Sequence, residues 1–328
     1  MRRYLLLVIM LLQPLSANAA EMHDATARLV QIPDHPTRVL PAGPPAAVLL
    51  GALAPDLLMG WPYPLSPETR AWLPDAINVL PTVPMLTGRQ DVIYQVAALG
   101  PDLILDFGTV SPRYIQLDEA VQSKTGIPTV LLDGALAKTP QVLRELGVAL
   151  HREDRANLLA MQAEAILAAI PRPHGAVPRV VYGLGADGLN VAAADTGAAE
   201  VFTLLGWQVL APEGTGTVRR TSLEVIASLD PDVLIFQNSA MRQIVAQSPQ
   251  WRALRAVQQH HAYVAPARPF GWLGEPPSIN RLLGLGVLSS DWGGAAVLAA
   301  TFHAVVYGRA PTAEQLNALQ EGLQPLSP

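Results

Sequence analysis

The sequence predicts an α/β fold with two doubly wound lobes joined by a single long helix. Three observations support this prediction. Short apolar runs alternate with helical segments, one helix–turn–strand pattern occurs twice, and one uninterrupted helical segment lies between the two halves. The chain has 328 residues, 50% of them hydrophobic, and a chain of this length usually forms more than one hydrophobic core. We therefore expect two domains.

The candidate strands are short apolar runs bounded by Pro, Gly and Asp. Such runs are typical of parallel strands that are covered on both faces. Helical segments lie between them, so helices are expected on both faces of each sheet. The predicted strands are residues 56–60, 103–106 and 129–132 in the first half, and 180–183, 233–236 and 262–264 in the second.

A weak internal repeat supports two similar lobes. Residues 96–105 (VAALGPDLIL) and 226–235 (IASLDPDVLI) share one pattern, in which Pro and Asp stop a helix and set a turn before a buried strand. Two related lobes explain this repetition. The alternative is that the pattern is a common helix–strand junction, which recurs in unrelated α/β proteins.

The segment between the halves, residues 152–170, is the longest helical pattern after residue 19 and has no internal Gly or Pro. At about 1.5 Å per residue it would reach about 30 Å, enough to connect two domains. An ordinary helix covering one continuous sheet is the alternative. The predicted domains are an N-terminal lobe (20–150), the connecting helix (151–171) and a C-terminal lobe (172–328).

The amino end has the pattern of a secretory signal peptide, residues 1–19. Two arginines precede an apolar run at residues 5–12, and Ala17-Asn18-Ala19 forms a small-residue cleavage site. The apolar run is shorter than the ~20 residues that a membrane-spanning helix needs. The chain contains no cysteine, which excludes a lipid-modified cysteine, disulfides and thiolate ligands. We expect export to the periplasm without a lipid anchor.

Charge and motifs argue against other classes of protein. The net charge of -5 lacks the basic excess typical of nucleic-acid binding. The sequence has no Gly-x-Ser-x-Gly elbow, no His-Glu-x-x-His pair and no phosphate-binding Gly-x-x-x-x-Gly-Lys motif. A periplasmic hydrolase on a similar scaffold is therefore a distant alternative to a protein that only binds.

Four segments resemble one group of periplasmic binding proteins: residues 101–110 (PDLILDFGTV), 125–128 (TGIP), 132–134 (LDG) and 269–282 (PFGWLGEPPSINRL). The group is the iron-complex type, which binds siderophores, haem or cobalamin. The resemblance extends over about residues 37–288, and the Gly-Trp-x-x-x-Pro-Pro-Ser-x-Asn-Arg segment is its most specific part.

The resemblance implies two α/β lobes joined by one long helix, a ligand held in the cleft between them and limited closure on binding. It also implies delivery of the ligand to a dimeric ABC permease in the inner membrane. We expect a monomer with no cofactor of its own, whose ligand is a metal complex.

In this family, an acidic residue on each lobe pairs with permease arginines. Glu200 matches the second-lobe position, whereas the first-lobe position falls on Tyr94. Asp91 is the candidate substitute, because residues three apart on a helix share a face. The alternative for both carboxylates is ordinary surface solvation.

The ligand cleft is expected at the loops that follow the carboxyl ends of the strands. Aromatic side chains suit the apolar faces of a chelate and arginines suit its anionic oxygens, so the mixture predicts an organic metal complex, with a ferric siderophore first. The candidate ligand-binding residues are Trp61, Tyr63, Arg89, Asp106, Thr109, Tyr114, Tyr182, Arg219, Arg220, Arg268, Trp272 and Glu275.

Haem, cobalamin, an oxyanion or a nickel complex is the alternative ligand. Haem would require an axial ligand, for which the candidates are Tyr63, Tyr114 and Tyr182. The seven His are dispersed, which argues against a bare cation, although Glu275 or Asp106 would be able to complete a metal shell.

Some candidates have a purely structural alternative. Trp272 has the context of a loop residue packed on the core, and Arg219 with Arg220 fits a solvated pair before a helix that begins near Ser222. Arg281 we assign to a structural role, at the start of a predicted helix (278–288) that Ser278 caps.

Overall fold

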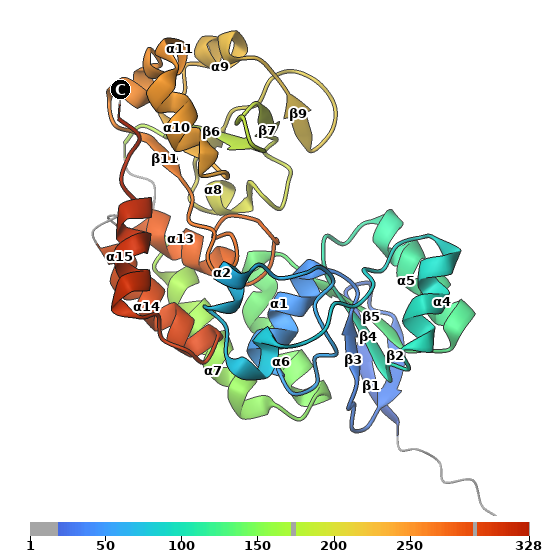
Figure 1. Cartoon of the computed structure of the whole chain (residues 1–328). Helices are drawn as coiled ribbons and strands as arrows, with labels where there is room; N and C mark the ends of the chain where they lie inside the picture. The colour runs from blue at the N-terminus through green and yellow to red at the C-terminus, as the bar shows by residue number, and fades with distance from the viewer. Residues whose placement is uncertain (1–18, 172–174, 291–293, 328) are drawn as a thin grey trace, which may run out of the picture.

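The computed structural model describes residues 19–171, 175–290 and 294–327 and shows two α/β lobes (Figure 1). The first lobe has a parallel sheet in the order β3–β4–β5, with the antiparallel hairpin β1–β2 as a separate sheet. The second lobe has a mixed sheet in the order β11–β10–β6–β7–β9, and β8 pairs with β6. The predicted two-lobed α/β fold is confirmed.

The strands of the first lobe are β1 (Ala19–His23), β2 (Leu29–Pro33), β3 (Val39–Pro41), β4 (Leu103–Gly108) and β5 (Thr129–Asp133). Those of the second lobe are β6 (Arg179–Leu184), β7 (Asn190–Ala192), β8 (Gln208–Val209), β9 (Val218–Arg220), β10 (Val233–Phe236) and β11 (Ala262–Val264).

The helices up to the end of the first lobe are α1 (Pro44–Leu53), α2 (Pro67–Arg70), α3 (Asp75–Asn78), α4 (Gln90–Ala98), α5 (Pro112–Thr125), the 3₁₀ turn η1 (Leu136–Lys138), α6 (Thr139–Ala149) and α7 (Glu153–Ala168). Those that follow are α8 (Glu200–Leu204), α9 (Leu223–Leu229), α10 (Ala240–Gln247), α11 (Pro249–Arg252), α12 (Arg255–Gln258), α13 (Arg281–Ser289), α14 (Ala295–Val306) and α15 (Ala313–Gly322).

One predicted strand, residues 56–60, is wrong. The place beside β4 is taken by β3, and residues 56–60 add only a single bridge, from Leu58 to Val39. The chain then turns away, because Trp61 pairs with residues 81–83 instead: its N–H donates to Pro81 and its carbonyl accepts from Val83. The other predicted strands correspond to β4, β5, β6, β10 and β11.

The internal repeat is a true structural repeat. In each lobe a helix, a turn and a buried strand follow one another, as α4–β4 and as α9–β10. The carboxylate of Asp102 accepts the N–H of Arg38 just before β3 (3.1 Å), and that of Asp232 accepts the N–H of Arg179 in β6 (2.9 Å). Each arginine also donates to two carbonyls at the C-terminal end of the helix, those of Leu99 and Gly100 after α4 or those of Leu229 and Asp230 at the end of α9. The same bonds therefore join helix, turn and neighbouring strand in both lobes.

Helix α7 lies within the segment predicted to connect the lobes. It packs against α6 and also against α1, α13 and α14, and it buries Ala156, Leu159 and Ala163 in these contacts. The prediction that one helix alone links the lobes is not confirmed, because other helices pack along α7. The predicted domain bounds remain a prediction.

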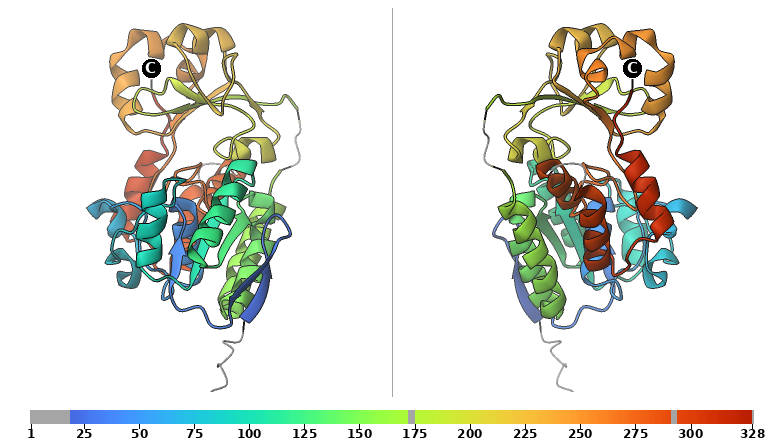
Figure 2. Two further views of the ribbon diagram at one scale, coloured as in Figure 1. Left: turned by 90° about the vertical axis from the view of Figure 1, so that its right-hand side faces the viewer. Right: turned by 90° about the vertical axis from the view of Figure 1, so that its left-hand side faces the viewer.

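The last part of the chain passes between the lobes twice more. After β11, residues 265–280 lead back to α13, α14 and α15, which lie beside the first lobe in both views of Figure 2. The chain then returns to the second lobe, where the N–H of Leu326 donates to the carbonyl of Ala262 (2.7 Å). The largest apolar core accordingly includes residues of the first lobe, the β6 strand and the C-terminal helices.

Helix α14 buries His303 in this core. The ring centroid of His303 lies 5.1 Å from that of Trp72 and 5.3 Å from that of Tyr307. Neither ring nitrogen has a hydrogen-bond partner among the described residues. Burial lowers the pKa of His303 to about 4, so the folded protein holds this ring neutral.

We expect His303 to make the fold acid-sensitive. The unfolded chain binds a proton at this ring below about pH 6.5 and the folded one only near pH 4, so stability falls as the pH decreases through this window, by about 2 kcal/mol at pH 5. Urea unfolding at pH 7 and pH 5 measures the loss. It should be smaller in His303→Phe, which cannot bind the proton; an equal loss in both proteins would contradict the assignment.

The predicted signal peptide, residues 1–19, lies outside the described residues except for Ala19 at its end. Within the described ranges, no helix combines the length and the apolar character needed to cross a membrane.

Candidate ligand-binding cleft

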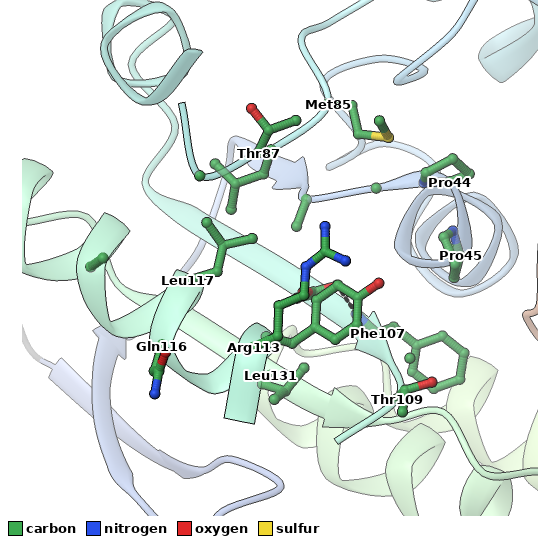
Figure 3. Close-up of a pocket in the computed structure, with 18 of the residues that line it drawn as sticks. Pro44, Pro45, Met85, Thr87, Phe107, Thr109, Arg113, Gln116, Leu117 and Leu131 are labelled. Atoms are coloured by element: carbon green, nitrogen blue, oxygen red, sulfur yellow. Dashed lines mark hydrogen bonds between the residues drawn. The ribbon is translucent and has the colours of Figure 1, made fainter. Parts of the chain in front are cut away.

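A cavity in the first lobe lies where strands β3 and β4 end and helices α1 and α5 begin (Figure 3). Its volume is about 560 Å³, within the range of small-molecule sites. We call it the first-lobe cavity. Its walls are largely apolar and include Pro44, Pro45, Met85, Leu86, Phe107, Tyr114, Leu117 and Leu131.

Two cations of helix α5, Arg113 and Lys124, also line the first-lobe cavity. In Figure 3 the guanidinium of Arg113 extends into the space bordered by Met85 and Thr87. Neither cation forms an ion pair within the described residues; the guanidinium of Arg113 lies 5.8 Å from the ring centroid of Tyr114. Residues of the first turns of α1 and α5 also line the cavity, and helix N-termini carry positive partial charge. Asp106 is the one acidic residue among the described lining residues, so the charged groups of this apolar cavity are predominantly positive.

A second cavity, of about 570 Å³, lies between the lobes. We call it the interlobe cavity. Loops after β4 and β5 form one side, and residues 194–203 and 274–281 form the other. It shares Gly108, Thr109 and Pro277 with the first-lobe cavity, so the two adjoin along one loop.

A third cavity, of about 500 Å³, lies at the carboxyl ends of β6 and β10. We call it the second-lobe cavity. Its polar side chains are the exposed carboxylate of Glu275, the amides of Asn190, Gln237 and Asn238, and the hydroxyl of Ser239. No Lys or Arg lines it, so its charge is opposite to that of the first-lobe cavity.

A buried ion pair ties the lobes together beside the interlobe cavity. Arg281, at the start of α13, is 2% exposed, and its Nη1 lies 2.5 Å from Oε2 of Glu200 in α8. Its Nη2 donates to the carbonyl of Gly134 in the first lobe (2.6 Å). The other oxygen of Glu200 accepts the N–H of Leu136 in the first lobe (2.7 Å). Both partners therefore join the two lobes.

The Pro-Pro-Ser-x-Asn-Arg segment fixes the path of the chain between the lobes. The hydroxyl of Ser278 donates to the carbonyl of Pro45 in α1 (2.7 Å), and the amide of Asn280 donates to the carbonyls of Gly271 and Pro276. The prediction that Ser278 caps a helix is wrong, because α13 begins only at Arg281 and the hydroxyl is used for this link. The structural role predicted for Arg281 is confirmed.

Half of the predicted ligand-binding residues line these cavities. Asp106, Thr109 and Tyr114 line the first-lobe cavity, and Thr109 also lines the interlobe cavity. Tyr182, Trp272 and Glu275 line the second-lobe cavity, although Tyr182 and Trp272 are almost wholly buried. Trp272 donates from Nε1 to the carbonyl of Arg268 (3.2 Å), which agrees with its structural alternative.

The two aromatic candidates Trp61 and Tyr63 line none of the three cavities. Trp61 is 1% exposed, donates from Nε1 to the carbonyl of Ile77 (2.8 Å) and packs on Phe270. Burial, together with the nearby charge of Glu275, raises the pKa of Tyr63 to about 12. Trp61 therefore belongs to the core and Tyr63 packs, partly buried, against it; the ligand-binding role of both residues stays a prediction.

The arginine candidates also lie away from the cavities. Arg89 pairs with Asp91 (2.7 Å) and Arg220 with Asp187 (2.6 Å). Arg219 donates to the carbonyl of Pro212 (2.7 Å), and Arg268 lines none of the three cavities. A free cation for an anionic ligand is instead supplied by residues that the sequence reasoning did not select.

The cations that line the first-lobe cavity, Arg113 and Lys124, were not selected from the sequence. The position of Arg113 was the available signal. Pro112 occupies the first turn of α5, and α5 follows β4 through a short loop, so side chains of this turn lie at the carboxyl end of the sheet. Sequence reasoning selected Tyr114 there and passed over its neighbour.

The described residues contain no group of three or more His, Asp or Glu placed to hold a metal ion. His260 and His261, which are adjacent in the sequence, are both exposed at a turn before β11.

A family model described as periplasmic binding protein matches residues 67–269, more than half of the chain. The chain belongs to this family. Its members bind a substrate and are not enzymes. No curated protein matches the chain.

This binding protein also resembles solved structures. An ABC transporter solute binding protein from Sulfurospirillum deleyianum has a TM-score of 0.81 at 24% identity, covering 91% of this chain and 98% of that one. The molybdate-bound MolA of Haemophilus influenzae has a TM-score of 0.68 at 15% identity, covering 89% and 99%. A periplasmic heme binding protein from Pseudomonas aeruginosa has a TM-score of 0.51 at 25% identity, covering 84% and 94%.

As a member of this family, the chain is a periplasmic binding protein. The docking roles of Glu200 and Asp91 remain predictions. In the structure each carboxylate already has an arginine partner, Arg281 for Glu200 and Arg89 for Asp91.

Proposed function

We propose that this binding protein captures an anionic metal chelate, a ferric siderophore first, and delivers it to an ABC permease. One observation carries the proposal: the first-lobe cavity combines apolar walls with two cations, Arg113 and Lys124, that form no ion pair with any residue the structure describes. An anionic chelate presents both an apolar organic surface and negatively charged oxygens, which such walls and cations complement.

The size of the cleft favours a chelate over a small anion. The first-lobe cavity holds about 560 Å³ and adjoins the interlobe cavity. A bare oxyanion would leave most of that volume unfilled and would be held by backbone N–H groups and hydroxyls rather than by apolar walls. MolA binds molybdate. The present chain is 15% identical to MolA, and a similarity at this level supports a shared fold and not a shared ligand.

Haem is the second candidate, and one residue favours it. Of the three tyrosines considered as axial ligands, Tyr182 is buried and Tyr63 is partly buried and lines none of the three cavities, whereas Tyr114 is 38% exposed and lines the first-lobe cavity. The phenol oxygen of Tyr114 would be the axial ligand, and Arg113 beside it would pair with a propionate. The likeness to a heme binding protein agrees with this candidate.

The test is a binding panel. Native mass spectrometry of protein purified from the periplasm identifies any copurified ligand. Quenching of tryptophan fluorescence then measures binding of ferric tricatecholate, ferric trihydroxamate, ferric citrate, haem, cobalamin and molybdate.

The proposal expects saturable binding of an anionic ferric chelate and no binding of molybdate. Binding of haem with a Soret shift that disappears in Tyr114→Phe would establish the second candidate instead. Molybdate as the one ligand bound would overturn both.

A further inference from the structure

A carboxyl group is buried behind the first-lobe cavity. Asp118, on α5, is 1% exposed, and neither of its carboxylate oxygens has a hydrogen-bond partner among the described residues. An ionised carboxylate in such a place would lose its hydration without replacement. The structure therefore disfavours the charged form of Asp118.

The neighbouring charges do not neutralise Asp118. The groups that act on it are Asp106, Arg28 and Asp24. Arg28 is already used, because its Nε donates to Oδ2 of Asp24 (2.9 Å) and its Nη2 donates to the carbonyl of Thr129 (2.8 Å). The cluster thus has three carboxyl groups and one cation that is bound to one of them.

Asp24 keeps its charge within this cluster. Burial opposes the charge, but hydrogen bonds from Thr26 and Arg28 outweigh it and lower the pKa of Asp24. The negative charge that Arg28 does not balance therefore belongs to Asp106 and Asp118.

Burial disfavours the charged form of both groups. Burial, and then the charge of Asp106, raise the pKa of Asp118 to about 8, and burial raises the pKa of Asp106. Beside the β1–β2 hairpin residues Asp24 and Arg28, the elements that contact α5 most are α4 and β5. Their titratable side chains, Asp91, Tyr94 and Asp133, are not among the groups that act on Asp118.

Asp106 connects this pair to the ligand site. It is at the carboxyl half of β4 and lines the first-lobe cavity together with Arg113 and Lys124. Each negative charge on the Asp106–Asp118 pair offsets part of the positive potential that these cations provide. Protonation of the pair restores this positive potential.

We propose that the Asp106–Asp118 pair is a proton site coupled to the first-lobe cavity, so that binding of an anionic ligand and retention of a proton by the pair favour each other. The inference rests on the proposed function. It names Asp118 as a residue that sets the affinity without contacting the ligand.

The experiment is a pH series of binding with ferric tricatecholate as the probe, from about pH 6.5 to about pH 9, on either side of the Asp118 pKa. Affinity of the wild-type protein should fall with rising pH, by up to about ten-fold per pH unit above the pKa. Calorimetry in buffers of different ionisation enthalpy should detect proton uptake on binding near pH 8.

Asp118→Asn is the decisive variant, because its amide is neutral at every pH. We expect its affinity to be nearly independent of pH and, at pH 9, higher than that of the wild-type protein. A gain in affinity cannot arise from misfolding. The matched control is Glu119→Gln, which removes the same charge from the neighbouring, exposed position of α5 and should keep the wild-type pH dependence.

The outcomes separate the two proposals. Binding with the same pH dependence in the wild-type protein and Asp118→Asn would overturn the coupling and leave the proposed function standing. Absence of ferric tricatecholate binding in both proteins at every pH, with none of the other chelates bound either, would overturn the proposed function and the coupling with it.

Discussion

Replacing Arg281 by Ala should lower the free energy of unfolding by about 3 kcal/mol or more, because removing one partner of a buried ion pair leaves the other without compensation. Glu200 would keep its charge with only the N–H of Leu136 to bind it. The carbonyls of Gly134 and Gly197 would also lose their donor. Urea unfolding at pH 7 measures the loss.

The matched control for this prediction is Arg144→Ala. Arg144 also pairs with a glutamate, Glu164, at 2.6 Å, but both side chains are largely exposed. Exposed ion pairs contribute little to stability because solvent screens them, so this variant should remain close to the wild-type protein. Equal losses in the two variants would show that the Arg281 pair does not join the lobes as described.

The same geometry affects any test of permease docking. Glu200→Arg would place a second guanidinium beside Arg281, so a transport defect in that variant would combine lost stability with lost docking. A docking test is interpretable only when the variant's stability is measured beside its transport.

Replacing Arg113 by Ala should weaken binding of an anionic ferric chelate by about 10- to 100-fold, since a hydrogen bond to a charged group contributes about 1.5–3 kcal/mol. The fold should be unaffected, because Arg113 is exposed and forms no ion pair within the described residues. Fluorescence titration at one pH and ionic strength measures the change.

Arg89→Ala is the matched control for Arg113. Arg89 belongs to the same lobe and precedes α4 as Arg113 opens α5, but it pairs with Asp91 and does not line the first-lobe cavity. Its replacement should leave affinity nearly unchanged. A larger loss from Arg89→Ala than from Arg113→Ala would place the ligand elsewhere.

The fold was predictable because local patterns and tertiary structure agree. The Pro-Asp turns at residues 101–102 and 231–232 stop a helix and begin a buried strand in both lobes, as their pattern indicated. Strand β3 was missed because only three residues form it, and its pairing with β4 is a long-range contact that no local pattern reports.

The candidate site was less predictable, for reasons that particular residues illustrate. Trp61 and Arg89 have suitable chemistry and lie in suitable loops. Trp61 is engaged by the carbonyl of Ile77, a contact that only the tertiary structure shows, and Arg89 is engaged by the nearby Asp91, to which the sequence analysis gave another role. Arg113 was passed over although its neighbour Tyr114 was selected. Loop position alone therefore does not show which side chains face a cavity.

The burial of Asp118 was also not predictable from the sequence. It precedes Glu119 in a polar stretch of α5, a pattern typical of a solvated helix face. Its burial depends on the packing of α5 on β5, and the charges beside it belong to the β1–β2 hairpin, where Asp24 and Arg28 bind each other. The hairpin was not predicted, so neither was the buried carboxyl group.

The location of the metal in a crystal of the complex tests the central claim most directly. The measurement is iron anomalous diffraction from the protein crystallised with ferric tricatecholate. We predict one iron peak in the first-lobe cavity, with the chelate oxygens within hydrogen-bonding distance of Arg113. A peak in the second-lobe cavity beside Glu275, or none in the cleft, would contradict it.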